Sequence, residues 1–118
     1  MTTILRIDSS IRTDGSVSRA VADTLEASIV ESEGPQTTVV RRDLALDPID
    51  SGVWATAAFA RYVPETVWTP DQKTASAVTS TLADEVEAAD VLVVGAPLYN
   101  FGVSAHLKTW IDTLITDP

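Results

Sequence analysis

Hydroxyl side chains are concentrated in one short segment of the sequence, "DSSIRTDGSVSR" at residues 8–19. Its hydroxyl donors are Ser9, Ser10, Thr13, Ser16 and Ser18. The segment lies between an apolar run and a stretch of helical periodicity, so we expect a loop that leads from a strand into a helix. Free backbone N–H groups at a helix start, together with hydroxyls, are suited to a phosphate monoester. An ordinary helix cap made by Ser16 or Ser18 explains the same residues equally well.

The charges and glycines of this loop bear on what it binds. Asp8 and Asp14 oppose an anion unless they point away, whereas Arg12 and Arg19 compensate for them. The glycine fingerprints of dinucleotide and nucleoside triphosphate sites are absent from the sequence. A serine-rich loop without closely spaced glycines favours a terminal phosphate, such as that of FMN, over an internal pyrophosphate.

A second segment, "APLYNFG", combines aromatic residues with an amide directly after an apolar run. Pro97 and Gly102 bend and stiffen it, and Tyr99 and Phe101 are costly to expose unless a flat apolar body covers them. Asn100 offers a hydrogen-bond donor and an acceptor. This mixture suits a flavin, whose ring has apolar faces and a hydrogen-bonding edge. Aromatic residues that cap the core or a subunit interface would show the same pattern.

Three apolar runs predict the strands that position these loops, at residues 4–8, 37–44 and 90–97. Helical patterns separate them, so parallel pairing through crossover helices is expected. Arg6 is the one charged residue inside the first run, and the third run is typical of a strand covered on both faces. In a parallel α/β sheet, ligands collect at the carboxyl ends of the strands, where both candidate loops begin.

Periodicity also predicts the helices. The apolar residues of the first are Val21, Leu25 and Ile29, and Gly34-Pro35 ends it. A capping box at Thr69 and Gln72 begins the second long helix. The last helix has Val103, Leu107, Trp110, Ile111 and Leu114 on its apolar side. We expect Lys108 and Asp112 to pair one turn apart on its outer side, where His106 also falls as a surface histidine.

The long connection at residues 45–69 has no assigned role from its sequence. Trp54, Ala58 and Tyr62 are spaced to share one helical face. A connection of this length is rarely a simple tether. A flap over a ligand, a subunit contact and a helix that packs on its own domain remain open alternatives.

Composition excludes several classes of function. The 118 residues suffice for one domain, 1–118, with one hydrophobic core. A net charge of −9 repels nucleic acid, and the absence of cysteine excludes disulfides and thiolate chemistry. One histidine argues against a His-rich metal site. Because no apolar stretch is long enough for a membrane span and the N-terminus lacks signal-peptide features, we expect a cytoplasmic protein without membrane partners.

The two loops carry a resemblance to a known family. The stretch "PLYNFGVSAHLKTWID" resembles the signature P-M-Y-N-F-x-x-(S/P)-x-x-L-K-x-W/Y-x-D of the FMN-dependent NADH azoreductases, which are related to NAD(P)H:quinone reductases. "DSSIRTDGSVSR" and "RRDLALDPI" are similar to that family's phosphate loop and second-strand segment. By position, the resemblance assigns the phosphate to Ser10, Ser16, Val17 and Ser18, and the flavin ring to Pro97, Leu98, Tyr99, Asn100 and Phe101. Leu98 replaces a frequent methionine, which changes little in volume or polarity.

The resemblance implies a fold and an activity. The fold is flavodoxin-like, a three-layer α/β/α arrangement around a parallel sheet. The activity is two-step hydride transfer, in which NADH or NADPH reduces FMN and the flavin then reduces an azo compound or a quinone. The cofactor carries this chemistry, so no catalytic side chain and no metal is expected. The family builds its active sites from two subunits, which implies a homodimer.

Family members continue beyond the region that this chain matches, with two further strands and a third flavin loop. Residues 1–118 are therefore expected to form the N-terminal part of the fold, with strand order 2-1-3 and the apolar third strand at an open edge. Either a complementing chain or a second copy covers that edge, or residues 1–118 are an excised or cleaved fragment. Two other functions stay open: a flavin-free interaction or assembly protein that uses the 97–101 loop and the Trp54–Tyr62 segment as contact surface, and a flavodoxin-like electron carrier.

Overall fold

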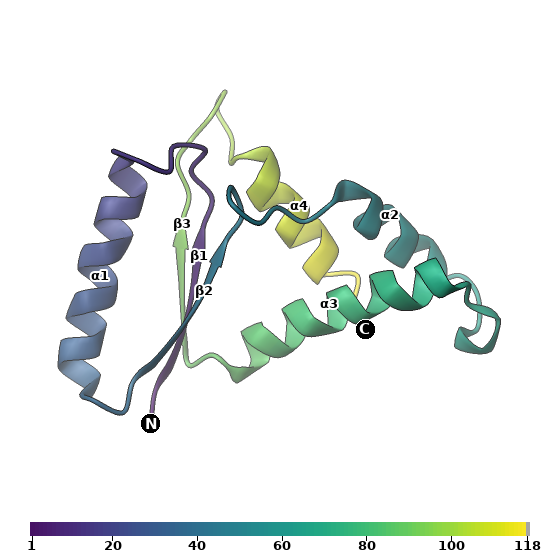
Figure 1. Ribbon diagram of the computed structural model, residues 1–118, viewed down its shortest axis with the longest axis horizontal. Helices are drawn as coiled ribbons and strands as arrows, with labels where there is room; N and C mark the ends of the chain where they lie inside the picture. Colours follow the sequence, from purple (N-terminus) through teal and green to yellow (C-terminus); the bar gives the residue numbers. More distant parts are fainter. Residues whose placement is uncertain (118) are drawn as a thin grey trace.

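The sheet has three parallel strands in the order β2-β1-β3. The computed structural model describes residues 1–117; Pro118, the last residue of the predicted domain, lies outside them. The strands are β1 (Thr3–Asp8), β2 (Thr38–Asp43) and β3 (Val91–Gly95). The register pairs Asp8 with both Asp43 and Gly95, so all three strands end at the same level (Figure 1). The predicted parallel α/β fold and its strand order are confirmed.

Side chains of β1 alternate between two apolar layers, as the pleat of a strand requires. Leu5 and Ile7 face one side and belong to the main core cluster, which also contains Leu44, Leu82, Leu107 and Trp110. Ile4 faces the other side, where it packs with Ala22 and Val93. Helices α3 and α4 supply the first layer and α1 the second, so the sheet lies between helices (Figure 1).

Helix α1 (Val17–Glu33) covers the second face and ends where the sequence predicts. Gly34 adopts φ 93° at its C-cap, a left-handed conformation that glycine tolerates, and its N–H donates to the Val30 carbonyl. Two of the apolar residues that predict this helix, Val21 and Leu25, are 61% and 47% exposed, and only Ala22 is buried. These two residues border the free edge of β3, where no further strand of the described chain covers them.

The helices of the other layer begin at clear capping signals. Helix α3 (Pro70–Ala88) starts with the predicted capping box, in which Thr69 and Gln72 exchange backbone and side-chain hydrogen bonds. Helix α4 (Ala105–Leu114) begins at Ser104, whose hydroxyl accepts from the Leu107 N–H. Its start therefore falls two residues after the expected Val103. The predicted Lys108–Asp112 pair forms at 2.6 Å.

The long connection folds into α2 (Ser51–Ala60) and a short 3-10 helix, η1 (Glu65–Val67). The predicted face of Trp54, Ala58 and Tyr62 is not the packed one: Ala57 and Ala60 are buried, whereas Trp54 is 42% exposed. Tyr62 lies beyond the end of the helix and is 83% exposed. Small side chains allow α2 to approach α3 and α4 closely, so the packing alternative is realised while the aromatic side chains face solvent.

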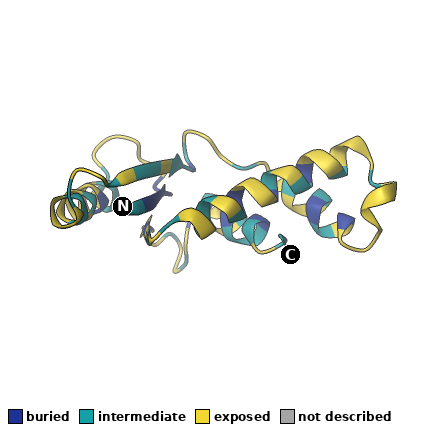
Figure 2. Cartoon of the chain, turned by 90° about the horizontal axis from the view of Figure 1, so that it is seen from below, coloured by how far each residue is buried: buried dark blue, intermediate teal, exposed yellow. Residues whose placement is uncertain are grey.

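The β3 edge and the far end of α3 give the molecule an open shape. Its radius of gyration is 15.9 Å, whereas a compact domain of this length would have about 13.5 Å. The helical end extends away from the sheet, and exposed residues dominate it (Figure 2). On β3, Leu92 and Val94 are 45% and 39% exposed, so the expected coverage of this strand on both faces is not found within residues 1–117. In that same part of the chain, no helix is long and apolar enough to cross a membrane.

Candidate functional site

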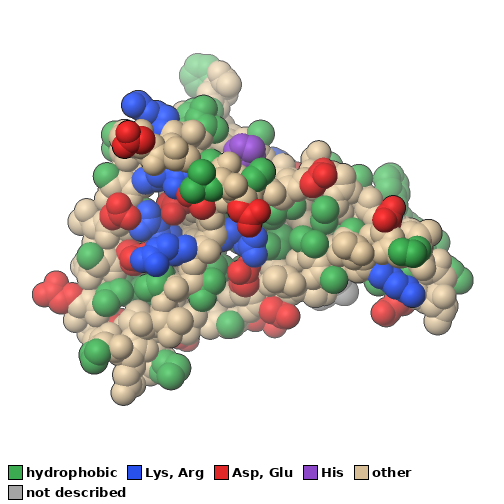
Figure 3. All heavy atoms as spheres, viewed as in Figure 1, with side chains coloured by type: hydrophobic (Ala, Val, Ile, Leu, Met, Phe, Trp, Pro, Cys, Tyr) green, Lys and Arg blue, Asp and Glu red, His purple; other side chains and the backbone are tan. Residues whose placement is uncertain are grey.

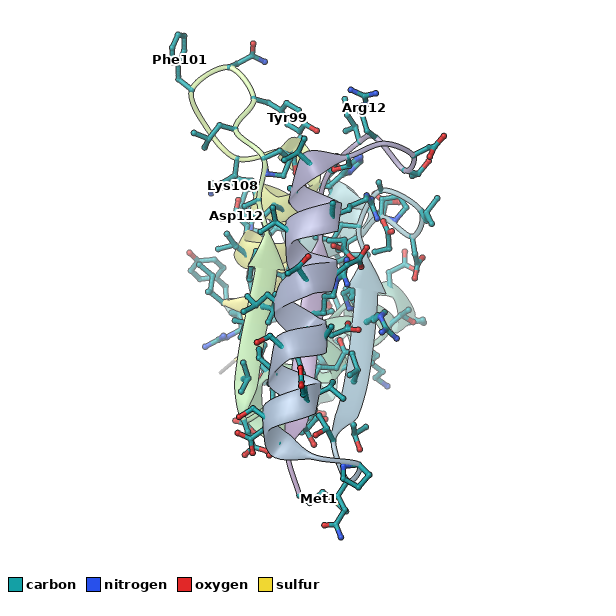
Figure 4. The ribbon with its side chains drawn as sticks, turned by 90° about the vertical axis from the view of Figure 1, so that its left-hand side faces the viewer. Met1, Arg12, Tyr99, Phe101, Lys108 and Asp112 are labelled. Atoms are coloured by element: carbon teal, nitrogen blue, oxygen red, sulfur yellow. The ribbon has the colours of Figure 1, made fainter. Side chains whose placement is uncertain are left out.

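The two candidate loops leave neighbouring strands at the carboxyl-terminal end of the sheet. The first follows β1 and the second follows β3, and both lie at the end of the sheet opposite Met1 (Figure 4). The buried Ser9 hydroxyl donates to the Gly95 carbonyl at 2.6 Å. This bond ties the start of the first loop to the end of β3, so the two loops share a common base.

The Tyr99 phenol connects the two loops directly. Its oxygen accepts a hydrogen bond from the Ile11 N–H at 3.2 Å and lies 3.4 Å from the Ser10 hydroxyl. Hydrogen bonding from Ser10, and then from Ile11, lowers the pKa of Tyr99 from its ordinary value. The Ser10 oxygen also accepts from the Arg12 N–H at 3.2 Å. Ser10 and Tyr99, predicted at the two ends of one ligand, are thus brought together.

The turn after β3 holds two residues in a conformation that side chains disfavour. Tyr99 and Gly102 exchange backbone hydrogen bonds at 2.7 and 2.9 Å, and the residues between them, Asn100 and Phe101, have φ 49° and 68°. Positive φ at both central residues is the pattern of type I′ turns, where Asn is favoured but a bulky aromatic residue is an outlier. Such strain persists only where the surrounding structure imposes it, and it clusters at ligand sites.

The turn presents its side chains to solvent. Leu98 is 77% exposed and Phe101 is fully exposed, whereas Pro97 is half-buried. Phe101 points away from the body of the molecule, and Tyr99 points back towards the first loop (Figure 4). An exposed aromatic ring is a costly arrangement, and a bound planar ligand would cover it.

At the start of α1, the predicted serines are close together. Ser16 is the N-cap and accepts from the Arg19 N–H at 3.3 Å, and its hydroxyl lies 3.1 Å from that of Ser18. The ordinary cap is therefore present. It does not exclude anion binding, because the first N–H groups of the helix, including that of Val17, have no partner within the helix itself.

The arginines of the first loop have different roles. Arg19 is engaged: its guanidinium bonds to both carboxylate oxygens of Asp43 and to the Ser10 carbonyl. The hydrogen bond from Arg19 to Asp43 is the main cause of the lowered pKa of Asp43. Arg19 was expected to compensate for Asp8 and Asp14, but its direct carboxylate partner is Asp43. Arg12 is exposed beside Gly15, at the outer rim of the loop (Figure 4).

A hollow of about 630 Å³ lies beside the turn. Its lining residues are Ile11, Tyr99, Asn100, Gly102, Val103, Ser104, Ala105, His106 and Lys108. His106 was expected on the solvated surface, but it is half-buried in the wall of this hollow. Another cavity, of about 500 Å³, lies far from both loops between α2 and α3.

Three contributors to this region were not selected from the sequence. Ile11 acts through its backbone N–H, which no side-chain pattern reveals. Asp43 acts through Arg19, across 24 residues of sequence. His106 is expected on the outer side of the last helix because it directly precedes Leu107; its half-burial comes from the hollow beside the turn after β3, which helical periodicity does not describe.

Comparison with known proteins identifies relatives of this chain. A family model described as a flavodoxin-like fold matches residues 2–117. The FMN-dependent NADH:quinone oxidoreductase of Xanthobacter autotrophicus is 44% identical over 115 residues, covering 98% of this chain and 54% of the relative. The enzyme of the same description from Erythrobacter litoralis is 41% identical, covering 97% and 56%. The chain thus spans about half the length of these curated relatives.

Solved structures show the same partial coverage. An azoreductase from Bacillus anthracis superposes with a TM-score of 0.74 at 28% identity, covering 97% of this chain and 55% of that one. The azoreductase AzrA gives a TM-score of 0.76 at 27% identity, covering 96% and 55%. Together with the match of the family model to nearly all of its residues, these similarities show that the chain belongs to the family of flavodoxin-like proteins.

Proposed function

We propose that this protein is the cofactor-binding part of an FMN-dependent NAD(P)H oxidoreductase that reduces quinones or azo compounds. The observation that carries the proposal is the link from Tyr99 to Ser10 and Ile11, which holds a hydroxyl-rich loop and an aromatic turn beside one another. Relatives at 41–44% identity, named FMN-dependent NADH:quinone oxidoreductases, support it. We treat residues 1–118 as one flavodoxin-like unit.

The residues at the start of α1 fit the phosphate of FMN. Backbone N–H groups of Val17 and Ser18 are free of helical partners, and the hydroxyls of Ser16 and Ser18 lie 3.1 Å apart at the same helix end. The helix dipole adds positive potential there. Ser10, at the base of the loop, completes the set that we assign to the phosphate end.

The turn after β3 fits the ring of FMN. Leu98 and Phe101 offer exposed apolar surface, and Asn100 between them offers an exposed amide. Together with Pro97 and Tyr99, these residues form the ring end of the proposed site. A flavin needs both kinds of contact, apolar on its faces and polar along one edge.

The chain's own residues bind and orient; they do not carry out the redox chemistry. Bound FMN supplies two-electron chemistry, between NADH or NADPH and a quinone or azo acceptor. The Tyr99 link keeps the ring end and the phosphate end at a fixed separation, and the apolar surface of the turn excludes water from the ring. We assign no catalytic side chain and no metal.

We also infer that further structure covers the β3 edge in the working protein, from further residues of the same protein, a complementing chain or a second copy. Leu92 and Val94 on β3, and Val21 and Leu25 on α1, leave apolar surface along this edge. Unpaired apolar edges promote association. The exposed aromatic residues of the α2 region, Trp54 and Tyr62 among them, favour a second candidate function, in which this surface serves assembly without flavin.

Flavin binding separates the two functions. The purified chain is examined for flavin absorbance, then FMN is titrated and its fluorescence followed. Quenching that saturates supports the oxidoreductase, and NADH oxidation with a quinone or an azo dye then distinguishes a reductase from an electron carrier. No quenching up to high micromolar FMN would reject the flavin site and leave the assembly function.

A further inference from the structure

Arg6 occupies an unusual place at the centre of the sheet. It lies in the middle strand on the side that faces α1, between Ile4 and Asp8, and it is only 4% exposed. Asp8 is 6% exposed. This face of β1 therefore changes from apolar at Ile4 to ionic at Arg6 and Asp8 as the strand approaches the candidate site.

The Arg6 guanidinium is bonded on every side. Nε and Nη2 donate to the Asp8 carboxylate at 3.1 and 3.2 Å, Nη1 donates to Asp23 at 2.6 Å, and Nη2 donates to the Arg19 carbonyl at 3.3 Å. Burial alone would lower the pKa of Arg6, but the hydrogen bonds to Asp23 and Asp8 outweigh it and raise that pKa. Glu26 joins the cluster at 3.5 Å and pairs with Arg41 of β2 at 2.5 Å. Basic and acidic side chains lie next to one another on the visible face of the molecule (Figure 3).

Two of the Arg6 partners, the Asp23 carboxylate and the Arg19 carbonyl, belong to the first two turns of α1. Arg19 and Asp23 lie within seven residues of the helix start at Val17. A buried ion pair is no more stabilising than apolar residues of similar volume, so stability alone does not account for a charge at this position. A rigid guanidinium fork does fix geometry better than apolar contacts, because each of its bonds has a required direction.

Asp8 lies close to the backbone of Ser18, one of the residues assigned to the anion end of the proposed site. A side chain at Gly95 would meet the Asp8 carboxylate at 3.4 Å and the Ser18 carbonyl at 3.6 Å, so both groups border the space above this glycine. An uncompensated carboxylate here would repel a phosphate held at Ser16–Ser18. The two bonds from Arg6 place a positive charge directly on Asp8.

We propose that Arg6 is a positioning residue for the phosphate end of the ligand: it fixes the first turns of α1 against β1 and neutralises Asp8 beside them. This inference rests on the proposed FMN site and assigns Arg6 an effect on the phosphate but not on the ring. Arg6 touches no part of the ligand. Its effect passes through Asp8, Asp23 and the Arg19 carbonyl.

The experiment compares FMN with riboflavin, which has the same ring but no phosphate, in fluorescence titrations of wild type and Arg6→Met. We expect Arg6→Met to weaken FMN about tenfold, because the Asp8 carboxylate is then left uncompensated near the phosphate, and to change riboflavin less than about twofold. Arg42→Met is the matched control. It removes a part-buried pair with Glu85, at 2.7 Å on the opposite face of the sheet, and should leave the FMN-to-riboflavin ratio unchanged.

The outcomes are distinct. Equal weakening of both ligands, or of neither, would overturn the positioning role while leaving the flavin site intact. Wild-type protein that binds neither ligand would overturn the proposed function, and this inference with it. If circular dichroism shows that Arg6→Met is unfolded, Arg6→Lys replaces it: loss of the guanidinium fork with the charge retained should weaken FMN by about threefold to fivefold and spare riboflavin, and unchanged FMN affinity would overturn the proposal.

Discussion

The Tyr99 hydroxyl lies 3.4 Å from the Ser10 hydroxyl, although 89 residues separate the two in sequence. The same oxygen accepts from the Ile11 N–H at 3.2 Å. Two loops that leave different strands are therefore joined by one side chain. This contact sets the distance between the groups that we assign to the two ends of FMN. A mutation that removes the Tyr99 hydroxyl should therefore change that distance.

Tyr99→Phe should separate the loops without removing the aromatic ring. Loss of the hydroxyl leaves the Ile11 N–H without this partner, at a cost of about 1 kcal/mol, which corresponds to about fivefold weaker FMN binding. The measurement is a fluorescence titration with FMN. Tyr62→Phe, at an 83% exposed position outside the candidate site, is the control and should bind as wild type does. Equal FMN affinities for wild type, Tyr99→Phe and Tyr62→Phe would show that the Tyr99 hydroxyl does not position the flavin site.

Phe101→Gly should weaken FMN binding and raise the free energy of unfolding. Relief of positive φ at a non-glycine residue favours the folded state, and after the entropic cost of glycine we expect a gain of about 0.5–1 kcal/mol in unfolding free energy. Urea unfolding measures this gain. Phe101→Ala is the matched variant, because it removes the ring but keeps the strained backbone. Both should weaken FMN, and only the glycine variant should be stabilised; a stabilised alanine variant would show that strain is not the cause.

The sequence predicts the fold well and the site incompletely, for physical reasons. Apolar runs bounded by loops locate β1 and β2, and the Thr69 capping box locates α3, because these signals are local. Local sequence does not determine whether Val21 and Leu25 are buried, because their burial depends on what pairs with the β3 edge. Periodicity describes which residues share a helix face, and it is silent on whether a neighbour covers that face.

Within the site, side-chain chemistry indicates the segments but not their connections. The serine loop and the aromatic turn can be chosen by residue type. The bond from Ile11 uses a backbone N–H, and the engagement of Arg19 by Asp43 joins residues on α1 and at the end of β2. The strain at Phe101 is likewise invisible, because its residue type argues against a turn with positive φ.

The Arg19–Asp43 pair should make stability depend on acid pH. The hydrogen bond from Arg19 lowers the pKa of Asp43, so the pair contributes stability that is present above the ordinary carboxylate pKa and is lost as pH falls through the lowered value. Asp43→Asn should therefore cost about 1–3 kcal/mol at pH 7, and the difference from wild type should shrink below pH of about 4. Urea unfolding at pH 7 and pH 3 measures it, with exposed Asp47→Asn as the control. A constant difference at both pH values would exclude the ion pair as its source.

The open edge of β3 should drive association. Val94→Lys places a charge on this edge, where lysine blocks strand pairing, and should lower self-association of the isolated chain. Light scattering over a range of concentrations measures the effect. Val67→Lys, at a 63% exposed position in η1, is the control and should associate as wild type does. If Val67→Lys lowers association and Val94→Lys does not, contact through the α2–η1 surface replaces the edge as the explanation.

The central claim, that the loops after β1 and β3 form one flavin site, is tested most directly by NMR. FMN is titrated into the ¹⁵N-labelled chain while amide chemical shifts are followed. The account predicts that amides of residues 10–18 and 98–102 shift together, with one common dissociation constant. Shifts confined to one of these loops, or located in the cavity between α2 and α3, would contradict it.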